Sequence, residues 1–191
     1  MMRASLVFAL VVAMMPAWAE EFTTFKGHGG PVMALDVAPG GQLVSASFDN
    51  SVGLWPGPTW LDGHNAAVVA LDASQAPKIF SGGDDFRVLM WQSGKPEPEV
   101  VTQHKGKVAD IAVFPEGSKL RVASASWDGF INISDMPADL NGEAPTVTTT
   151  VLKGHQSNVT SVAYTPAGRL FSTSSDGTLR VWDGERPSAL R

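Results

Sequence analysis

The chain has 191 residues, of which 43% are hydrophobic, and its formal net charge is −5. The absence of cysteine excludes disulfides, thiolate metal sites, cysteine nucleophiles and covalently attached haem, and the acidic balance argues against nucleic-acid binding. The charged fraction of 17% is low, whereas the 19 glycines and 13 prolines are many, so the composition favours an all-β protein of short strands joined by turns.

The first 19 residues have the pattern of a signal peptide. Arg3 is the lone charge before an apolar run at residues 4–15, and residues 17–19 (Ala-Trp-Ala) form a small-x-small cleavage site. The apolar run of about twelve residues is shorter than the roughly 20 that span a bilayer, which argues against a membrane anchor. We therefore predict cleavage after Ala19 and export of residues 20–191 to a bacterial periplasm, with no membrane association after cleavage.

Four copies of one pattern follow, at about residues 27–62, 63–102, 103–153 and 154–191. Each copy carries a histidine, a serine in a predicted strand and an aspartate in a predicted turn, and three copies add a tryptophan. The histidine and the turn aspartate are 21 residues apart in three copies and 24 in the third. The four sets are His28, Ser45, Asp49 and Trp55; His64, Ser81, Asp85 and Trp91; His104, Ser124 and Asp128; and His155, Ser172, Asp176 and Trp182.

Gly-His near one end of a copy and Trp-Asp near the other resemble the signature of the WD-repeat (WD40) family. The resemblance covers nearly all of residues 22–191, with Gln103 in place of a glycine and Ser134 in place of a tryptophan. It implies an all-β, WD40-type β-propeller with four blades of four antiparallel strands. It also implies a hydrogen-bonded chain of histidine, serine, aspartate and tryptophan inside each blade, which would supply the donors that a buried carboxylate needs.

Serine, histidine and aspartate are also the residue types of a catalytic triad. A triad occurs once in an active site, whereas this set recurs in every copy, so we predict a structural role and no catalysis. The prediction assigns all four histidines to the blades and leaves none as a general base or metal ligand, and we expect no cofactor. An alternative function is that of a propeller enzyme or calcium-binding protein that uses carboxylates of the central channel, namely Asp36, Asp72 and Asp110.

In the WD40 family the residue before the turn aspartate often points to the top face, where partners bind. Aromatic residues are unusual in turns and frequent at binding hot spots, although the same side chains could instead pack on a neighbouring blade. We therefore predict an exported, non-catalytic scaffold for an unidentified protein partner. The candidate binding residues are Phe48, Trp127, Met33, Pro31, Asp84 and Lys107. A second alternative is a shortened relative of a periplasmic WD40/c-type cytochrome protein that lacks the haem domain.

The number of four repeats does not determine how the propeller closes. We expect residues 22–26 to form an outer strand that completes the last blade, and residues 136–145 to form an exposed loop. Three assemblies are compatible with this arrangement: a closed four-bladed ring, a homodimer that forms an eight-bladed ring, and a truncated array with a partial ring.

Overall fold

The computed structural model describes residues 22–140 and 144–183, together with the backbone of residues 186–188. These residues form four antiparallel sheets of four strands each and no helix. The sheets follow one another in chain order, and we call them blades 1 to 4. The predicted all-β fold of WD40-type blades is confirmed. The predicted signal peptide and its cleavage site lie outside the described residues.

The strands of each blade pair in the order of the chain. Blade 1 contains β1 (Val32–Val37), β2 (Leu43–Ser47), β3 (Ser51–Leu54) and β4 (Thr59–Asp62). Blade 2 contains β5 (Val68–Asp72), β6 (Lys78–Gly83), β7 (Arg87–Gln92) and β8 (Glu99–Gln103). Blade 3 contains β9 (Val108–Glu116), β10 (Lys119–Ser126), β11 (Ile131–Pro137) and β12 (Thr148–Leu152). Blade 4 contains β13 (Val159–Tyr164), β14 (Leu170–Ser174), β15 (Leu179–Asp183) and β16 (Arg186–Ser188).

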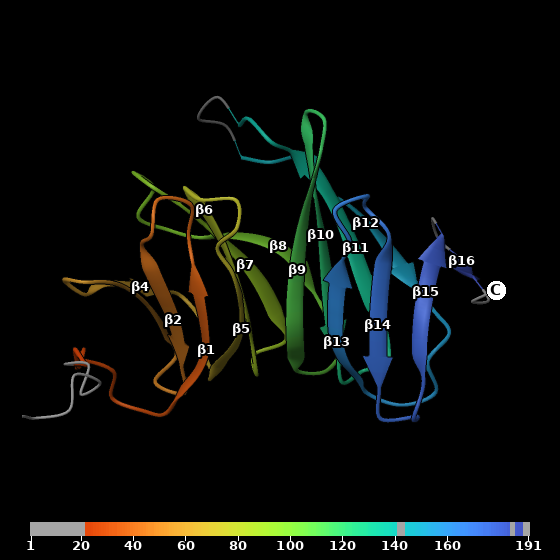
Figure 1. Cartoon of the computed structure of the whole chain (residues 1–191), viewed down its shortest axis with the longest axis horizontal. Coiled ribbons are helices and arrows are strands. Elements are labelled where there is room, and N and C mark those ends of the chain that lie inside the picture. The colour runs from red at the N-terminus through yellow and green to blue at the C-terminus, as the bar shows by residue number, and fades with distance from the viewer. Residues whose placement is uncertain (1–21, 141–143, 184–185, 189–191) are drawn as a thin grey trace, which may run out of the picture.

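The blades lie side by side in chain order, from orange β1–β4 at one end to blue β13–β16 at the other (Figure 1). Their first strands are neighbours, because β1 contacts β5, β5 contacts β9, and β9 contacts β13. Apolar side chains from adjacent blades fill the three junctions. The clusters include Val44, Val52 and Leu89 between blades 1 and 2, Phe80, Met90 and Ile111 between blades 2 and 3, and Ile131, Val162 and Trp182 between blades 3 and 4.

The third blade places its extra residues in a long hairpin. The paired histidine and serine are 20 residues apart in this blade and 17 in the others. Strands β9 and β10 have nine and eight residues, and they pair as far as Glu116 and Lys119. The longer spacing therefore extends the β9–β10 hairpin and leaves the serine and the turn aspartate in the same relation as in the other blades.

Two expectations about the chain ends and loops are wrong. Residues 22–26 form no strand, and the fourth strand of blade 4 is β16, which pairs with β15. The predicted exposed loop at 136–145 is also wrong over its first half. Strand β11 continues to Pro137, and the side chains of Met136 and Leu140 belong to the cluster between blades 2 and 3. Their apolar character outweighs the polar composition of the segment as a whole.

Candidate functional site

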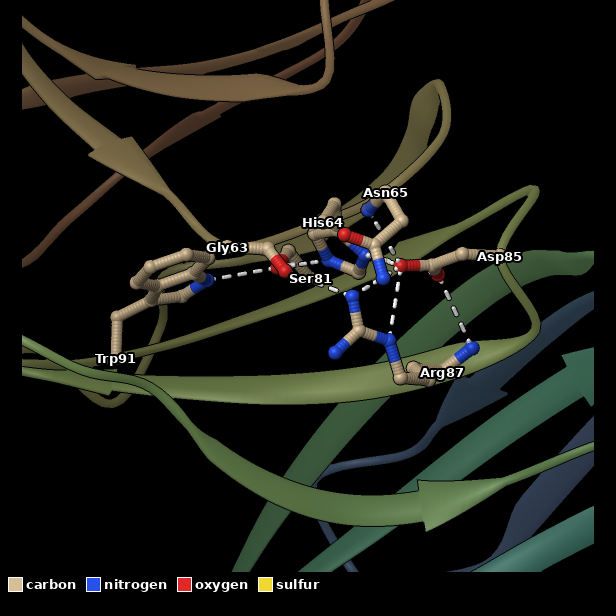
Figure 2. A network of polar contacts seen from close by, with 7 residues as sticks. All are labelled: Gly63, His64, Asn65, Ser81, Asp85, Arg87 and Trp91. Atoms are coloured by element: carbon tan, nitrogen blue, oxygen red, sulfur yellow. Dashed lines mark hydrogen bonds and ion pairs between the residues drawn. The ribbon is translucent and has the colours of Figure 1, made fainter.

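A chain of hydrogen bonds crosses blade 2 from its outer strands to its turn (Figure 2). The indole Nε1 of Trp91 donates to Ser81 Oγ at 2.7 Å, and Ser81 Oγ lies 2.8 Å from His64 Nε2. The other imidazole nitrogen, Nδ1, lies 3.0 Å from the carboxylate of Asp85. Because an ionised carboxylate can only accept, the imidazole proton is on Nδ1 and is donated to Asp85. The neutral ring then accepts the serine proton at Nε2, while the serine oxygen accepts from the indole.

Blades 1 and 4 contain the same chain. The indole-to-serine distances are 2.8 Å for Trp55 and Ser45 and 2.9 Å for Trp182 and Ser172. The histidine-to-serine distances in these blades are 2.7 and 2.8 Å, and the histidine-to-aspartate distances are 2.9 and 3.0 Å. The three serines in complete chains are at most 2% exposed. Their oxygens are already engaged and out of reach of a substrate, so this geometry supports a structural role.

Blade 3 holds a shorter version of the chain. His104 Nε2 lies 2.8 Å from Ser124 Oγ, and His104 Nδ1 lies 3.0 Å from Asp128. Ser134 stands where the other blades have tryptophan, and its hydroxyl bonds to Thr149 instead. Ser124 therefore lacks the indole donor that the equivalent serines receive.

Each turn aspartate also binds the loop before the first strand of its blade. The backbone N–H groups of Gly29, Asn65, Lys105 and Gln156 donate to the four aspartates at 2.7 to 3.0 Å. In blade 2 the guanidinium of Arg87 adds an ion pair with Asp85 at 2.7 Å and donates to the carbonyl of Gly63. The carboxylate thus connects a loop and a turn that are about twenty residues apart.

Burial and hydrogen bonding shift the pKa values of these groups. Burial lowers the pKa of His64 and of His104, although the facing aspartate acts in the opposite direction. For Asp85 and Asp128, burial acts to raise the pKa, but hydrogen bonds and the facing histidine outweigh it and the pKa is lowered. Both partners are therefore stabilised as a neutral imidazole and an ionised carboxylate.

Residues at the turns and at the strand entries meet on one face, which we call the top face. In every blade the residue before the turn aspartate donates its backbone N–H to the residue that enters the first strand. The pairs are Phe48 to Pro31 at 3.0 Å, Asp84 to Ala67 at 2.8 Å, Trp127 to Lys107 at 3.0 Å and Ser175 to Asn158 at 2.9 Å. The structure thereby brings together the turn and strand-entry candidates of each blade.

Two large aromatic side chains of the top face are open to solvent. Phe48 is 47% exposed and Trp127 is 49% exposed. About half of each side chain is therefore free of contact with the rest of the protein. Pro31 and Met33 are exposed as well, and Met33 lies in a β-bulge of β1 between Val32 and Ala34.

The remaining candidates join blades 2 and 3. Lys107 Nζ lies 4.3 Å from the ring centroid of Trp127 and 3.7 Å from Asp84 Oδ1. The ammonium therefore connects an exposed aromatic ring of blade 3 to a carboxylate of blade 2. The cluster is partly exposed and combines an apolar indole ring with one positive and one negative group.

One exposed residue of the top face was missed from the sequence. Phe86 follows Asp85 in the turn of blade 2, is 41% exposed, and has a φ of 70°. The equivalent turn positions hold Asn50, Gly129 and Gly177, residue types that tolerate a left-handed backbone. A phenylalanine in this conformation is strained, and such strain is frequent at binding sites. The signal in the sequence was a phenylalanine at a turn position where the other three copies have asparagine or glycine.

The proposed channel carboxylates connect neighbouring blades. The backbone N–H of Ala73 donates to Asp36 at 2.7 Å, and that of Val113 donates to Asp72 at 2.7 Å. Asp110 accepts from the backbone N–H of Val162 at 3.0 Å. Within the described residues, no three histidine, aspartate or glutamate side chains come together as a metal-binding group. These three aspartates thus have a structural contact each and do not assemble into a calcium site.

A cavity of about 130 Å³ lies between blades 3 and 4. Its polar lining includes Arg121, Asp135 and Tyr164, of which the first two form an ion pair. The hydroxyl of Tyr164 is buried and has no hydrogen-bond partner among the described residues, and burial raises its pKa. The charged groups that line the cavity already neutralise each other.

The part of the chain that the structure describes has no helix with the length and hydropathy of a bilayer span.

Comparison with known proteins identifies the repeats. The family model described as "WD domain, G-beta repeat" matches residues 19–56, 58–92, 97–135 and 146–183. The chain is 28% identical over 183 residues to the ribosome biogenesis protein WDR12 homolog of Drosophila erecta, a match that covers 86% of this chain and 34% of the relative. It is 25% identical over 167 residues to transcription initiation factor TFIID subunit 5 of Caenorhabditis elegans, covering 83% of this chain and 24% of the relative. The chain thus spans about a third of the length of the fly relatives it matches.

These relatives correct the predicted location. They are eukaryotic proteins named for ribosome biogenesis or transcription initiation. Export to a bacterial periplasm is therefore wrong, and the comparison does not support a bacterial exported type of propeller. The prediction of export rested on the signal-peptide pattern of the first 19 residues alone. The matches name no catalytic family.

Proposed function

The chain belongs to the WD40 repeat family, and on this premise we propose that it is a non-catalytic scaffold that binds a protein partner through the top face of blades 1 to 3. The observation that carries the proposal is the row of exposed aromatic side chains at three consecutive turns. Phe48, Phe86 and Trp127 are each more than 40% exposed. Aromatic side chains supply large contact area and are enriched at binding hot spots.

Hydrogen bonds anchor the backbone beneath these side chains. Each turn is held by the carboxylate that also binds the preceding loop, as in the contacts of Asp49 with Gly29 and of Asp128 with Lys105. A rigid turn presents its aromatic side chain with little loss of conformational entropy on binding. The hydrogen-bonded chains of histidine, serine and aspartate therefore support binding by positioning the turns, and their buried serines supply no nucleophile.

The Lys107–Trp127–Asp84 cluster adds a polar component to the surface. The Lys107 ammonium lies 3.7 Å from Asp84, beyond hydrogen-bond distance, so it has donors for a carboxylate of the partner while it stays beside Asp84, and the indole ring remains available for apolar contact. We therefore expect the partner to offer an acidic group beside an apolar or aromatic side chain.

The relatives indicate the kind of assembly to examine first. One group is named as ribosome biogenesis proteins, and another relative is named as a subunit of a transcription initiation factor. We extend the proposal to a role as one subunit of a multiprotein assembly, with ribosome biogenesis complexes as the first candidates.

The test is quantitative capture of partners by matched variants. The double variant Phe48→Ser with Trp127→Ser removes two exposed rings, and Val151→Ser removes an exposed apolar side chain of β12 as the control. Partners recovered with the parent chain and with the control should be lost with the double variant, and isolated partners should bind at least about tenfold more weakly to it. An unchanged set of partners and unchanged affinities would overturn the proposal.

A further inference from the structure

The junctions between blades repeat one apolar contact. The contact joins two repeat positions. One is the residue seven positions after the histidine, on the first strand of the following blade. The other is the residue three positions after the turn aspartate, on the third strand of the preceding blade. The paired residues share a buried cluster at each junction: Val52 with Leu71, Val88 with Ile111, and Ile131 with Val162. Two packed blades therefore cover one residue of each kind, of which Leu71 is partly buried and the other five are buried.

Both halves of this contact are uncovered at the ends of the row of blades. The first-strand position of blade 1 is Leu35, which is 64% exposed. At the same position Leu71 is partly buried, and Ile111 and Val162 are at most 5% exposed. The third-strand position of blade 4 is Leu179, which is 54% exposed, whereas Val52, Val88 and Ile131 are at most 1% exposed.

A further first-strand position gives the same contrast. Val32 stands four residues after its histidine and is 53% exposed. At the same position Val68, Val108 and Val159 are fully buried against the preceding blade. We call Val32, Leu35 and Val37 the leading face of blade 1, and Phe171, Thr173 and Leu179 the trailing face of blade 4.

The trailing face is a single surface of one sheet. Thr173 and Leu179 are direct cross-strand partners on β14 and β15, and Phe171 lies two residues before Thr173 on the same side. The six side chains of the two faces carry no charge, so their contact would leave no buried charge unpaired.

We propose that the leading face of one copy of this chain packs against the trailing face of a second copy, and that two such contacts close a ring of eight blades. The two faces lie at opposite ends of the row of blades (Figure 1), so one chain exposes both halves of the contact. A head-to-tail interface of this kind closes when the rotation between copies returns to the start. Eight blades lie within the range of known propellers.

The junction between copies differs from the internal ones in one respect. Asp36, Asp72 and Asp110 each accept a backbone N–H of the following blade. The corresponding positions of blade 4 hold Ser161 and Ala163, which offer no carboxylate. The contact between copies is therefore weaker than an internal junction, and we expect the pair to dissociate on dilution.

Sedimentation of the full chain tests the proposal. The parent chain should change from monomer to dimer as its concentration rises through the micromolar range. Leu35→Lys should abolish the dimer and retain the circular dichroism of the parent, whereas Val151→Lys, a matched change at an exposed residue of the outer strand β12, should retain the dimer. A parent chain that stays monomeric would overturn the proposal. Further blades of a longer chain that cover these faces would overturn it as well. Open polymers would overturn it too.

Cross-linking distinguishes this dimer from other pairings and is informative even if Leu35→Lys fails to fold. The chain contains no cysteine, so Leu35→Cys and Leu179→Cys each introduce one thiol. A short bismaleimide should join the two variants when they are mixed and should join neither variant to itself. Self-joining of Leu35→Cys would show that two leading faces meet, and it would contradict the head-to-tail arrangement.

Discussion

Arg121 and Asp135 are direct cross-strand partners, and the guanidinium Nε lies 2.8 Å from a carboxylate oxygen. Asp135 holds the position that follows tryptophan in the family signature, and Asp183 holds it in blade 4, where it pairs with Arg169 at 3.4 Å. In blade 2 the position holds Gln92, and its partner Lys78 donates instead to the carbonyl of Ala138 in blade 3. The signature aspartate thus pairs with an arginine in the two blades that contain it.

We expect a small coupling energy between Arg121 and Asp135. Both side chains are about one-third exposed, and exposed ion pairs contribute about 0.2–1 kcal/mol. A double-mutant cycle with Arg121→Gln and Asp135→Asn, measured by urea unfolding, should give a coupling in this range that declines as salt is added. A coupling that does not respond to salt would contradict an electrostatic origin.

Ser81→Ala should destabilise the chain more than Ser124→Ala. Both serines are fully buried, but Ser81 Oγ contacts His64 and the indole of Trp91, whereas Ser124 Oγ contacts His104. Ser81→Ala therefore leaves one more buried polar group unpaired, which costs about 1–3 kcal/mol in the free energy of unfolding. The two variants remove the same atom from equivalent sites, so each serves as the control for the other. Equal losses would argue against a contribution from the indole.

Phe86→Gly should stabilise the fold and weaken partner binding. The left-handed backbone at Phe86 costs about 1–2 kcal/mol for a residue with a Cβ, and the greater entropy of unfolded glycine returns about 0.5–1 kcal/mol of this. Thermal unfolding should therefore show a gain of up to about 1.5 kcal/mol. Asn50→Gly, at the equivalent turn, should change stability less because asparagine tolerates this conformation. A gain in stability with unchanged binding would remove Phe86 from the binding surface.

Stability should decrease as the pH falls below about 6.5. The pKa values of His64 and His104 are lower in the folded chain than their ordinary value of 6.5, so the unfolded chain takes up protons first. Below the ordinary value of 3.8, the lowered pKa values of Asp85 and Asp128 act in the same direction. Burial raises the pKa of Asp72, which opposes this trend between that raised pKa and the ordinary value of 3.8.

Urea unfolding at neutral pH, at pH 5 and at pH 3 measures this dependence. We expect a stepwise fall in the free energy of unfolding, with His64→Gln flattening the first step. A free energy that stays constant from neutral pH to pH 5 would contradict the assignment of neutral, buried imidazoles to blades 2 and 3.

The repeated pattern predicted the blades because the residues that form the hydrogen-bonded chain of a blade all lie within one repeat. His64, Ser81, Asp85 and Trp91 occur in one stretch of chain, and their bonds form within one sheet. The turn tips Phe48 and Trp127 were also found from the sequence, since their place depends on the turn aspartate beside them. By contrast, Met136 and Leu140 are buried by side chains of blade 2, and nothing local in their polar segment shows that contact.

The sequence alone predicted the fold of each blade, the residues of each hydrogen-bonded chain and the turns that form the top face, because these depend on spacing along one repeat. The tertiary structure decided how Asp36 and Asp72 connect neighbouring blades, why Phe86 is strained, and which apolar residues stay uncovered. Leu35 and Ile111 occupy the same repeat position, yet the first is exposed and the second is buried. Burial depends on the neighbour that lies against a side chain in space, and equivalent repeat positions at the end and in the middle of a row of blades have different neighbours.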